Sequence, residues 1–246
     1  MTRTMTKWRF IAPFFLLLTP LLLQAEEPAP AQSLTLFDAK YDAFRSGKKL
    51  GEAKRYLKQT DSGYELGYSS DVSFLIFDDK RSETSWFVLQ QGRVQPQRYL
   101  MQRTGTGKDR YYELNLDWSQ QQLLVGKKRQ PKTLPWNAQW LDALGYQTQL
   151  VLDLKAGKTD FVYQVLNRDG NEREYHYKKA AEELVLLPYG KLKTIRIERT
   201  EKDKQVLAWV APELDYLLVR LWQAEDGVEQ FDIQLSELNG QTGSPK

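Results

Sequence analysis

Few residues in this chain of 246 residues could carry chemistry. His176 is the only histidine, and the chain contains no cysteine. Zinc sites built from nitrogen and sulfur ligands therefore lack their ligands, and a serine nucleophile would have only His176 as its base. His176 stands in the alternating run from Glu174 to Tyr177, which is typical of a solvent-facing strand residue. We expect no metal site, no cofactor and no catalytic residue.

Motif searches point the same way. The chain has no G-x-S-x-G elbow and no glycine pattern for nucleotide phosphates. Within residues 34–238, neighbouring carboxylates occur in three places, each at a predicted turn or strand end, where acids are usually solvated. A glycosidase pair could still be assembled from distant strands, so a carboxylate-dependent hydrolase remains a remote alternative. The three neighbouring pairs are Asp78-Asp79, Glu182-Glu183 and Glu225-Asp226.

The N-terminus resembles a secretory signal peptide. Residues 1–25 contain three basic residues and no acidic ones, with an apolar run from Phe10 to Leu23 and a small residue, Ala25, before Glu26-Glu27. The apolar run is too short to span a membrane comfortably, so we expect cleavage after about Ala25 and no integral membrane span afterwards. Residues 26–33 are expected to be a flexible leader. The predicted location is the bacterial periplasm.

Charge argues against several classes of partner. The chain has 35 basic and 32 acidic residues, and because residues 1–25 hold three of the basic ones, the remainder has 32 of each. A formally neutral chain lacks the positive footprint that drives nucleic-acid binding. The basic tract Lys127-Lys128-Arg129 with Lys132 is interpreted as a solvated hairpin rim, with phosphate or lipid binding as the alternative.

The elements that must position any site are mostly strands. Period-two alternation, as at Tyr64, Leu66 and Tyr68, recurs between turn signals from Leu34 to Gly126 and again from Thr159 onward. Between these halves, residues 137–155 carry apolar residues at three- and four-residue spacings and predict one helix, with Asn137 as its N-cap. The predicted fold is mainly β, an antiparallel meander forming an open or partly closed barrel, with this helix packed over the concave face.

The expected boundaries are a single β-rich domain over residues 34–238 and a disordered tail over residues 239–246. Aromatic residues near the predicted helix start and on later strands suggest an apolar lining between helix and sheet, which could hold an acyl chain or a hydrophobic peptide. Ordinary core packing is the alternative. The candidate lining residues are Trp136, Trp140, Leu144, Trp209 and Arg220.

The C-terminal half carries short motifs in a specific order. Tyr189-Gly190-Lys191-Leu192-Lys193-Thr194 is followed by Trp209-Val210-Ala211-Pro212 and then Tyr216-Leu217-Leu218-Val219-Arg220. With the strands from Tyr41 to Gly51 and with Asp142-Ala143-Leu144, this order resembles the domain of unknown function 3108 family over about residues 34–238. The resemblance implies an exported protein of Gram-negative bacteria with a β-rich, partly open barrel. It implies no activity and no catalytic residues.

These observations favour a monomeric periplasmic binding or chaperone-like module for an apolar ligand, either an acyl chain, a lipid or a peptide. The overall shape would then resemble lipoprotein carriers, an analogy of fold only. The main alternative is an envelope structural or interaction protein that docks on a protein partner through a sheet edge or surface strand.

Overall fold

The computed structural model of the protein describes residues 34–74 and 77–242, which form one 15-stranded sheet and one α-helix. The expected signal peptide (1–25) and leader (26–33) lie outside the described residues. The strands are β1 (Leu36–Arg45), β2 (Lys48–Thr60), β3 (Gly63–Phe74), β4 (Phe77–Gln90), β5 (Arg93–Gly105), β6 (Arg110–Asp117), β7 (Gln122–Val125), β8 (Gln130–Pro131), β9 (Trp140–Leu141), β10 (Asp160–Leu166), β11 (Glu172–Leu187), β12 (Gly190–Glu201), β13 (Lys204–Ala211), β14 (Leu217–Glu225) and β15 (Val228–Thr242). The α-helix is α1 (Gly145–Lys155), and a short 3-10 helix, η1 (Pro212–Leu214), follows β13.

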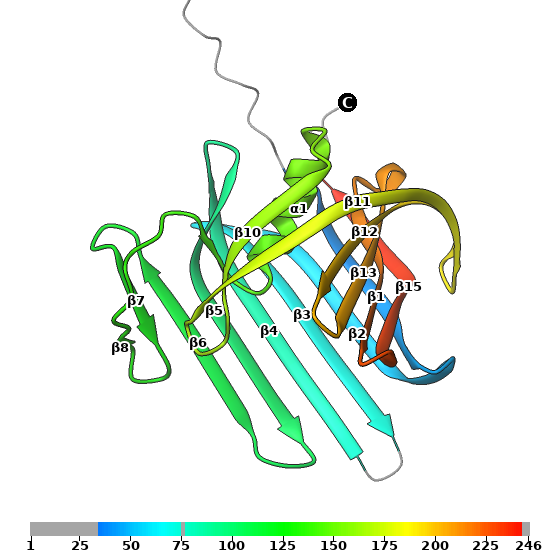
Figure 1. Ribbon diagram of the computed structural model, residues 1–246, viewed down its shortest axis with the longest axis horizontal. Helices are drawn as coiled ribbons and strands as arrows, with labels where there is room; N and C mark the ends of the chain where they lie inside the picture. Colours follow the sequence, from blue (N-terminus) through cyan, green and yellow to red (C-terminus); the bar gives the residue numbers. More distant parts are fainter. Residues whose placement is uncertain (1–33, 75–76, 243–246) are drawn as a thin grey trace, which may run out of the picture. The chain divides into compact units, whose positions relative to one another are not determined.

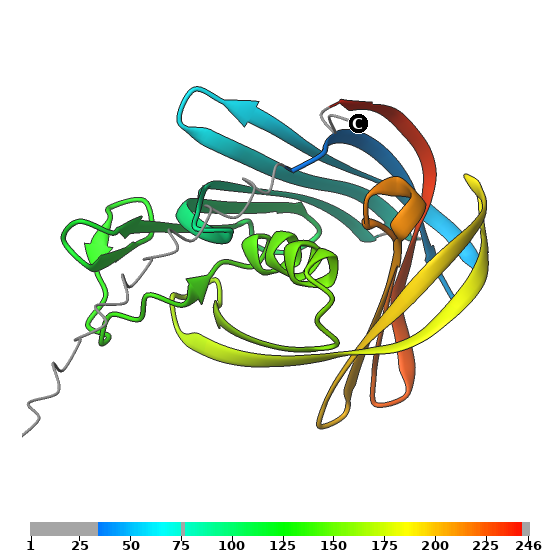
Figure 2. The same cartoon turned by 90° about the horizontal axis from the view of Figure 1, so that it is seen from above.

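The sheet is a meander whose two ends do not pair, and all its neighbouring strands are antiparallel except β9 and β10. Its strand order is β8-β7-β6-β5-β4-β3-β2-β1-β15-β14-β13-β12-β11-β10-β9, so β8 and β9 are the two edges. The sheet curls strongly, and Figure 2 shows α1 enclosed by this curl, with β2–β4 on one side and β11 on the other. Figure 1 shows the same arrangement from the side. The predicted mainly β, partly open barrel with a helix on its concave face is thus confirmed.

The tight hairpins follow from turn chemistry. At Gln91-Gly92 and Asp226-Gly227, both turn residues have positive φ, at 51° and 73° in the first and 51° and 72° in the second. Two successive positive values match the twist of the flanking strands, and glycine adopts them without steric cost.

The helix begins later than predicted, at Gly145 instead of Asn137. Asn137 makes a local turn, in which its Oδ1 accepts a 2.9 Å hydrogen bond from the amide of Gln139. Trp140 and Leu141 then form β9, which pairs in parallel with Gln164 and Val165 of β10. The helical spacing of Trp140, Leu141 and Leu144 therefore comes from two elements in succession, because short apolar runs do not distinguish strand from helix.

Asp142 orients the first turn of α1. Its Oδ1 accepts hydrogen bonds from the amides of Leu144 (2.8 Å) and Gly145 (2.7 Å), and its Oδ2 accepts one from Ser85 Oγ of β4 (2.5 Å). The carboxylate satisfies two amides that have no partner within the helix. It also ties the helix start to the sheet.

Two further polar side chains attach α1 to both parts of the curl. Gln149 Oε1 accepts a 2.9 Å hydrogen bond from the amide of Val94 on β5, and Asp153 Oδ2 accepts one of 2.9 Å from Tyr163 Oη on β10. Gln149 and Asp153 are both buried. The helix therefore bridges β5 and β10, which are not neighbours in the sheet.

The last strand is longer than expected. Residues 239–242, predicted to start a disordered tail, continue β15, and Thr242 is the register partner of Leu36 on β1. The alternation of apolar and polar residues ends at Leu238, so the sequence does not indicate this extension. The residues that follow, Asn239, Gly240 and Gln241, are weak strand formers. Residues 243–246 lie outside the described residues.

Candidate ligand-binding site

Two adjoining cavities lie between α1 and the inner face of the curled sheet. The larger has a volume of ≈ 540 Å³ and the smaller of ≈ 80 Å³. Residues from α1, β2, β11, β13 and β14 line both, so the two spaces share a wall. The shared residues are Arg55, Tyr146, Gln147, Tyr177, Val206, Leu218 and Leu221.

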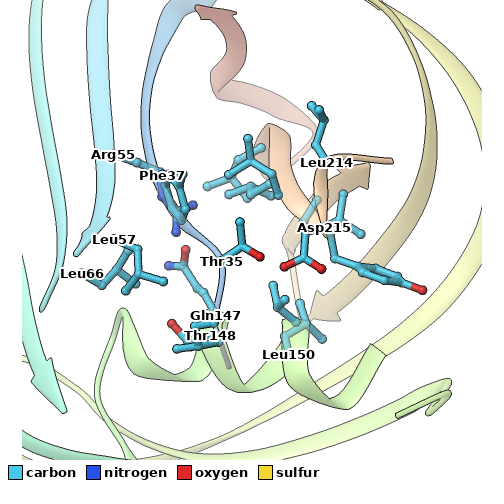
Figure 3. Close-up of a pocket in the computed structure, with 18 of the residues that line it drawn as sticks. Thr35, Phe37, Arg55, Leu57, Leu66, Gln147, Thr148, Leu150, Leu214 and Asp215 are labelled. Carbon is cyan, nitrogen blue, oxygen red and sulfur yellow. The ribbon is translucent and has the colours of Figure 1, made fainter. Parts of the chain in front are cut away.

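The smaller cavity is lined mainly by apolar side chains. Leu57 of β2 and Leu66 of β3 face Leu150 of α1 across it, and Figure 3 shows Leu214 with Asp215 closing the opposite side. These side chains come from strands far apart in the sequence because the curl of the sheet brings the inner faces together. An apolar space of this kind suits a hydrocarbon chain.

The larger cavity carries many charged groups, and cations outnumber anions. Its lining includes seven basic residues and three acidic ones: Arg45, Arg55, Arg81, Arg103, Arg168, Arg199 and Lys204, against Asp78, Asp79 and Glu83. Arg103 Nε binds Asp79 Oδ1 at 2.8 Å, and Arg81 forms an ion pair with Glu83. Glu83 is buried and also accepts a hydrogen bond from Tyr99 Oη.

A group of tyrosines stands at the wall between the cavities. Tyr146 of α1 stacks against Tyr177 of β11 with ring centroids 5.8 Å apart, and the Tyr177 hydroxyl donates to the Tyr146 hydroxyl at 3.2 Å. Tyr175 meets Tyr146 edge-on at 5.5 Å. Burial raises the pKa of the Tyr146 and Tyr177 hydroxyls. Both therefore stay protonated at neutral pH. Because Tyr177 donates its proton to Tyr146, the Tyr146 hydroxyl is the one that can donate a hydrogen bond to a ligand.

The chain matches the family "Protein of unknown function (DUF3108)" over residues 37–235. The chain belongs to the DUF3108 family. This confirms the resemblance seen in the sequence. A search of curated proteins finds no match.

Among solved structures, the DUF3108 chain is similar to a beta-barrel-like protein of domain of unknown function DUF1849 from Brucella abortus. The TM-score is 0.60 at 9% sequence identity, and the match covers 84% of this chain and 98% of that chain. At so low an identity, the similarity concerns the fold alone.

Leu144 is the one predicted lining residue that lies in a described cavity of the DUF3108 chain; it is buried and lines the larger one. Trp136 and Trp140 line neither cavity. Their rings meet each other edge-on at 5.2 Å, Trp136 also meets Trp118 at 5.0 Å, and Trp140 is fully buried and donates to Glu172. Because 137–144 is not helical, these tryptophans do not lie on α1. Trp140 belongs to the same hydrophobic core as Leu144 and Leu150, and Trp136 packs against that core.

Trp209 and Arg220 also line neither cavity. Val206, Ala208 and Val210 of β13 face the smaller cavity, so Trp209 points to the other side of the sheet. There its Nε1 donates to Glu183 at 2.6 Å, and the Arg220 guanidinium lies 4.6 Å from its ring centroid. Arg220 makes two hydrogen bonds to Asp232, at 2.9 Å and 2.7 Å.

The residues considered for catalysis are scattered. His176 is exposed and pairs with Glu174 at 2.5 Å, as its place on a solvent-facing strand predicts. Of the three carboxylate pairs, Asp78-Asp79 lines the larger cavity, whereas the other two line neither cavity. Within residues 34–74 and 77–242, no three His, Asp or Glu side chains gather as a metal site would need. No helix in these residues is long and apolar enough to cross a membrane.

Sequence reasoning missed the arginines of the inner face. Arg55 lies between buried Ala53 and Leu57 in the alternation of β2, and Arg199 follows Ile195 and Ile197 in that of β12. Each arginine occupies a position in its strand where the alternation calls for a buried apolar residue. This could have been noticed in the sequence, because charged residues are rarely buried unless they are paired.

Proposed function

We propose that this protein is a periplasmic ligand-binding module that holds an apolar chain between α1 and the inner face of the sheet, without catalysing a reaction. The observation that carries the proposal is the pair of adjoining cavities under α1. Their volumes of ≈ 540 Å³ and ≈ 80 Å³ bring the site into the range of about 300–1,000 Å³ that is typical of small-molecule sites.

The lining supports an apolar chain as the occupant of the smaller cavity. Leu57, Leu66 and Leu150 are buried in the core and face this space. Ala208 of β13 contributes only a methyl group to the same wall, which leaves room that a larger side chain would fill. A hydrocarbon chain there would replace water on surfaces that gain nothing from hydration.

The proposed location rests on residues 1–25, whose basic start, apolar run and small residue at the junction are the parts of an export signal. The absence of cysteine suits an oxidising compartment. We propose that the protein acts there as a monomer.

Native mass spectrometry after gentle extraction from the periplasm tests the function. The expected result is a population with the mass of the chain plus a lipid or other amphiphile. Ala208→Phe should fill the smaller cavity and remove this adduct. Leu207→Phe is the matched control, because it adds the same ring to the neighbouring position on the other side of β13.

Two results would contradict the proposal. One is a chain that never carries an apolar compound, even after incubation with fatty acids. The other is an adduct that Ala208→Phe retains while the folded state is unchanged. A single protein adduct after cross-linking in intact cells, with an empty interior, would favour the envelope docking alternative.

A further inference from the structure

Arg55 is a buried cation without a counter-ion among the described residues. The residue is 8% exposed, and its Nε has no hydrogen-bond partner among the described residues. No carboxylate of the described chain forms an ion pair with it. It lines both cavities, and Figure 3 shows it extending from β2 into the interior beside Phe37.

Arg199 is a second buried cation on the inner face. It is also 8% exposed, and its Nε and Nη1 lack hydrogen-bond partners among the described residues. Its nearest carboxylate oxygen, Oε2 of Glu201, is 3.7 Å from Nη1, beyond hydrogen-bond length. The guanidinium lies 3.8 Å from the ring centroid of Tyr175, whose electrons partly compensate its charge.

The surroundings of Arg199 are themselves positive. Arg168 and Lys204 line the same cavity. Burial, followed by the positive charge of Arg199, lowers the pKa of Lys204, and Arg168 adds to this effect, whereas Glu225 and Glu201 oppose it. The charges of Arg199 and Arg55 both act on the Tyr146 hydroxyl, so the two guanidinium groups approach the same place from different strands.

A buried guanidinium with N–H groups that lack acceptors destabilises a fold, because the charge loses its hydration without full compensation. Two such groups around one cavity are explained if a ligand supplies the missing negative charge. Guanidinium N–H groups match the oxygens of carboxylates and phosphates in geometry as well as charge.

We infer that the ligand is an amphiphile with an anionic oxygen head group, a carboxylate or a phosphate, bound by Arg55 and Arg199 in the larger cavity. This inference rests on the proposed function and specifies its ligand. The hydrocarbon chain then extends past Arg55 into the smaller cavity, since Arg55 lines both spaces and Arg199 only the larger. The protonated hydroxyls of Tyr146 and Tyr177 stand at the junction.

Calorimetric titration of the full chain with a matched series of twelve-carbon compounds tests the inference. The probes are dodecanoate, dodecyl phosphate, dodecanol and dodecyltrimethylammonium, with acetate and inorganic phosphate as anions without a tail. Dodecanoate or dodecyl phosphate should bind at least about tenfold more tightly than dodecanol, because a hydrogen bond to a charged group has that effect. The tighter of the two anions identifies the head group.

The variants Arg55→Gln and Arg199→Gln should each weaken binding of the anionic probe by about tenfold or more and leave dodecanol binding unchanged within about twofold. Arg196→Gln is the matched control: Arg196 lies on the same strand as Arg199, pairs with Glu183 and Glu198, and lines neither cavity. It should bind the probe as the unchanged protein does.

Thermal unfolding without ligand separates this role from a structural one. Removing a buried charge whose N–H groups lack acceptors should keep or raise the melting temperature, whereas a clear loss of stability in both variants would contradict the inference. Equal binding of dodecanol and dodecanoate would overturn the anionic head group and leave the proposed function standing. Binding of no twelve-carbon compound, or binding of acetate or phosphate as tight as that of the long-chain probes, would overturn the proposed function itself.

Discussion

The ammonium group of Lys155, in the last turn of α1, donates a hydrogen bond to Oδ2 of Asp215, which lies just after η1. Both residues line the smaller cavity. Asp215 and Tyr216 adopt positive φ values of 56° and 61°, a conformation that non-glycine residues rarely take and that surrounding contacts must hold. The ion pair therefore fixes the η1 turn against the helix at one end of the cavity.

Breaking this pair should speed ligand exchange. We expect Asp215→Asn, which tolerates the left-handed backbone but removes the charge, to raise the dissociation rate of bound dodecanoate by about twofold to fivefold, as loss of one partly exposed ion pair predicts. Stopped-flow displacement measures the rate. Lys158→Met is the control, because Lys158 pairs with Asp153 at 2.8 Å and lines neither cavity. Equal rates in all three proteins would show that the pair does not restrain the ligand.

Asp142 should make stability depend on pH. Burial raises the pKa of its carboxyl from 3.8 to about 6, so between these values the folded state binds more protons than the unfolded state. The contribution of Asp142 to stability is then highest at low pH and falls by about 2–3 kcal/mol as pH rises from about 4 to about 6.

Asp142→Asn removes this dependence and keeps the contacts, because an amide oxygen can accept from Leu144 and Gly145 while its nitrogen donates to Ser85 Oγ. Urea unfolding at pH 4 and pH 8 should show the variant gaining stability relative to the unchanged protein at the higher pH. Asp142→Ala, by contrast, should lose about 1–3 kcal/mol at both pH values. A difference between Asp142→Asn and the unchanged protein that is the same at both pH values would refute the raised pKa.

Gln149 is expected to be the most sensitive glutamine of α1. Gln149→Ala leaves the buried amide of Val94 without its acceptor, which should cost about 1–3 kcal/mol of unfolding free energy. Gln147→Ala removes only a hydrogen bond to the Ala143 carbonyl at 3.2 Å and should cost less than about 1 kcal/mol. Urea titration compares the two. Equal losses would mean that the bridge from α1 to β5 adds nothing to stability.

Gly51 of β2 and Gly67 of β3 should differ in how well they tolerate substitution by alanine. A Cβ at Gly51 would lie 2.1 Å from the carbonyl oxygen of Asp71, a backbone atom that cannot move without shifting β3. A Cβ at Gly67 would meet the end of the Tyr56 side chain, which can rotate away. We expect Gly51→Ala to cost about 1–3 kcal/mol and Gly67→Ala to cost less. Thermal unfolding of both variants measures this order, and the reverse order would contradict it.

The strands were predictable because their inner and outer faces differ. Tyr64, Leu66 and Tyr68 alternate with polar residues, and β3 indeed covers them. The helix start was not predictable from spacing, because Trp140 and Leu141 gain partners only when β10 lies beside them. That pairing is a tertiary effect, which local periodicity does not contain.

The candidate site was less accessible to sequence reasoning than the fold. Aromatic residues were predicted to line the site, yet Trp209 follows Ala208 directly on β13 and therefore points to the opposite side of the sheet. Arg55 and Arg199 stand 144 positions apart in the sequence, and only the curl of the sheet brings both into one cavity. The sequence shows each arginine at a strand position where an apolar residue is expected, but it does not show that the two line the same cavity.

The pairing of β1 with β15 has a consequence for how this chain could be reconnected. The β1–β15 pair joins the two ends of the described chain in the middle of the open sheet, whereas the sheet edges, β8 and β9, are successive in the sequence. A circular permutant cut within residues 132–139, with the old termini linked, would run from β9 through β15 and β1 to β8. Every antiparallel pair would then be a local hairpin. The slow step of joining the most distant segments would disappear, and folding should become faster.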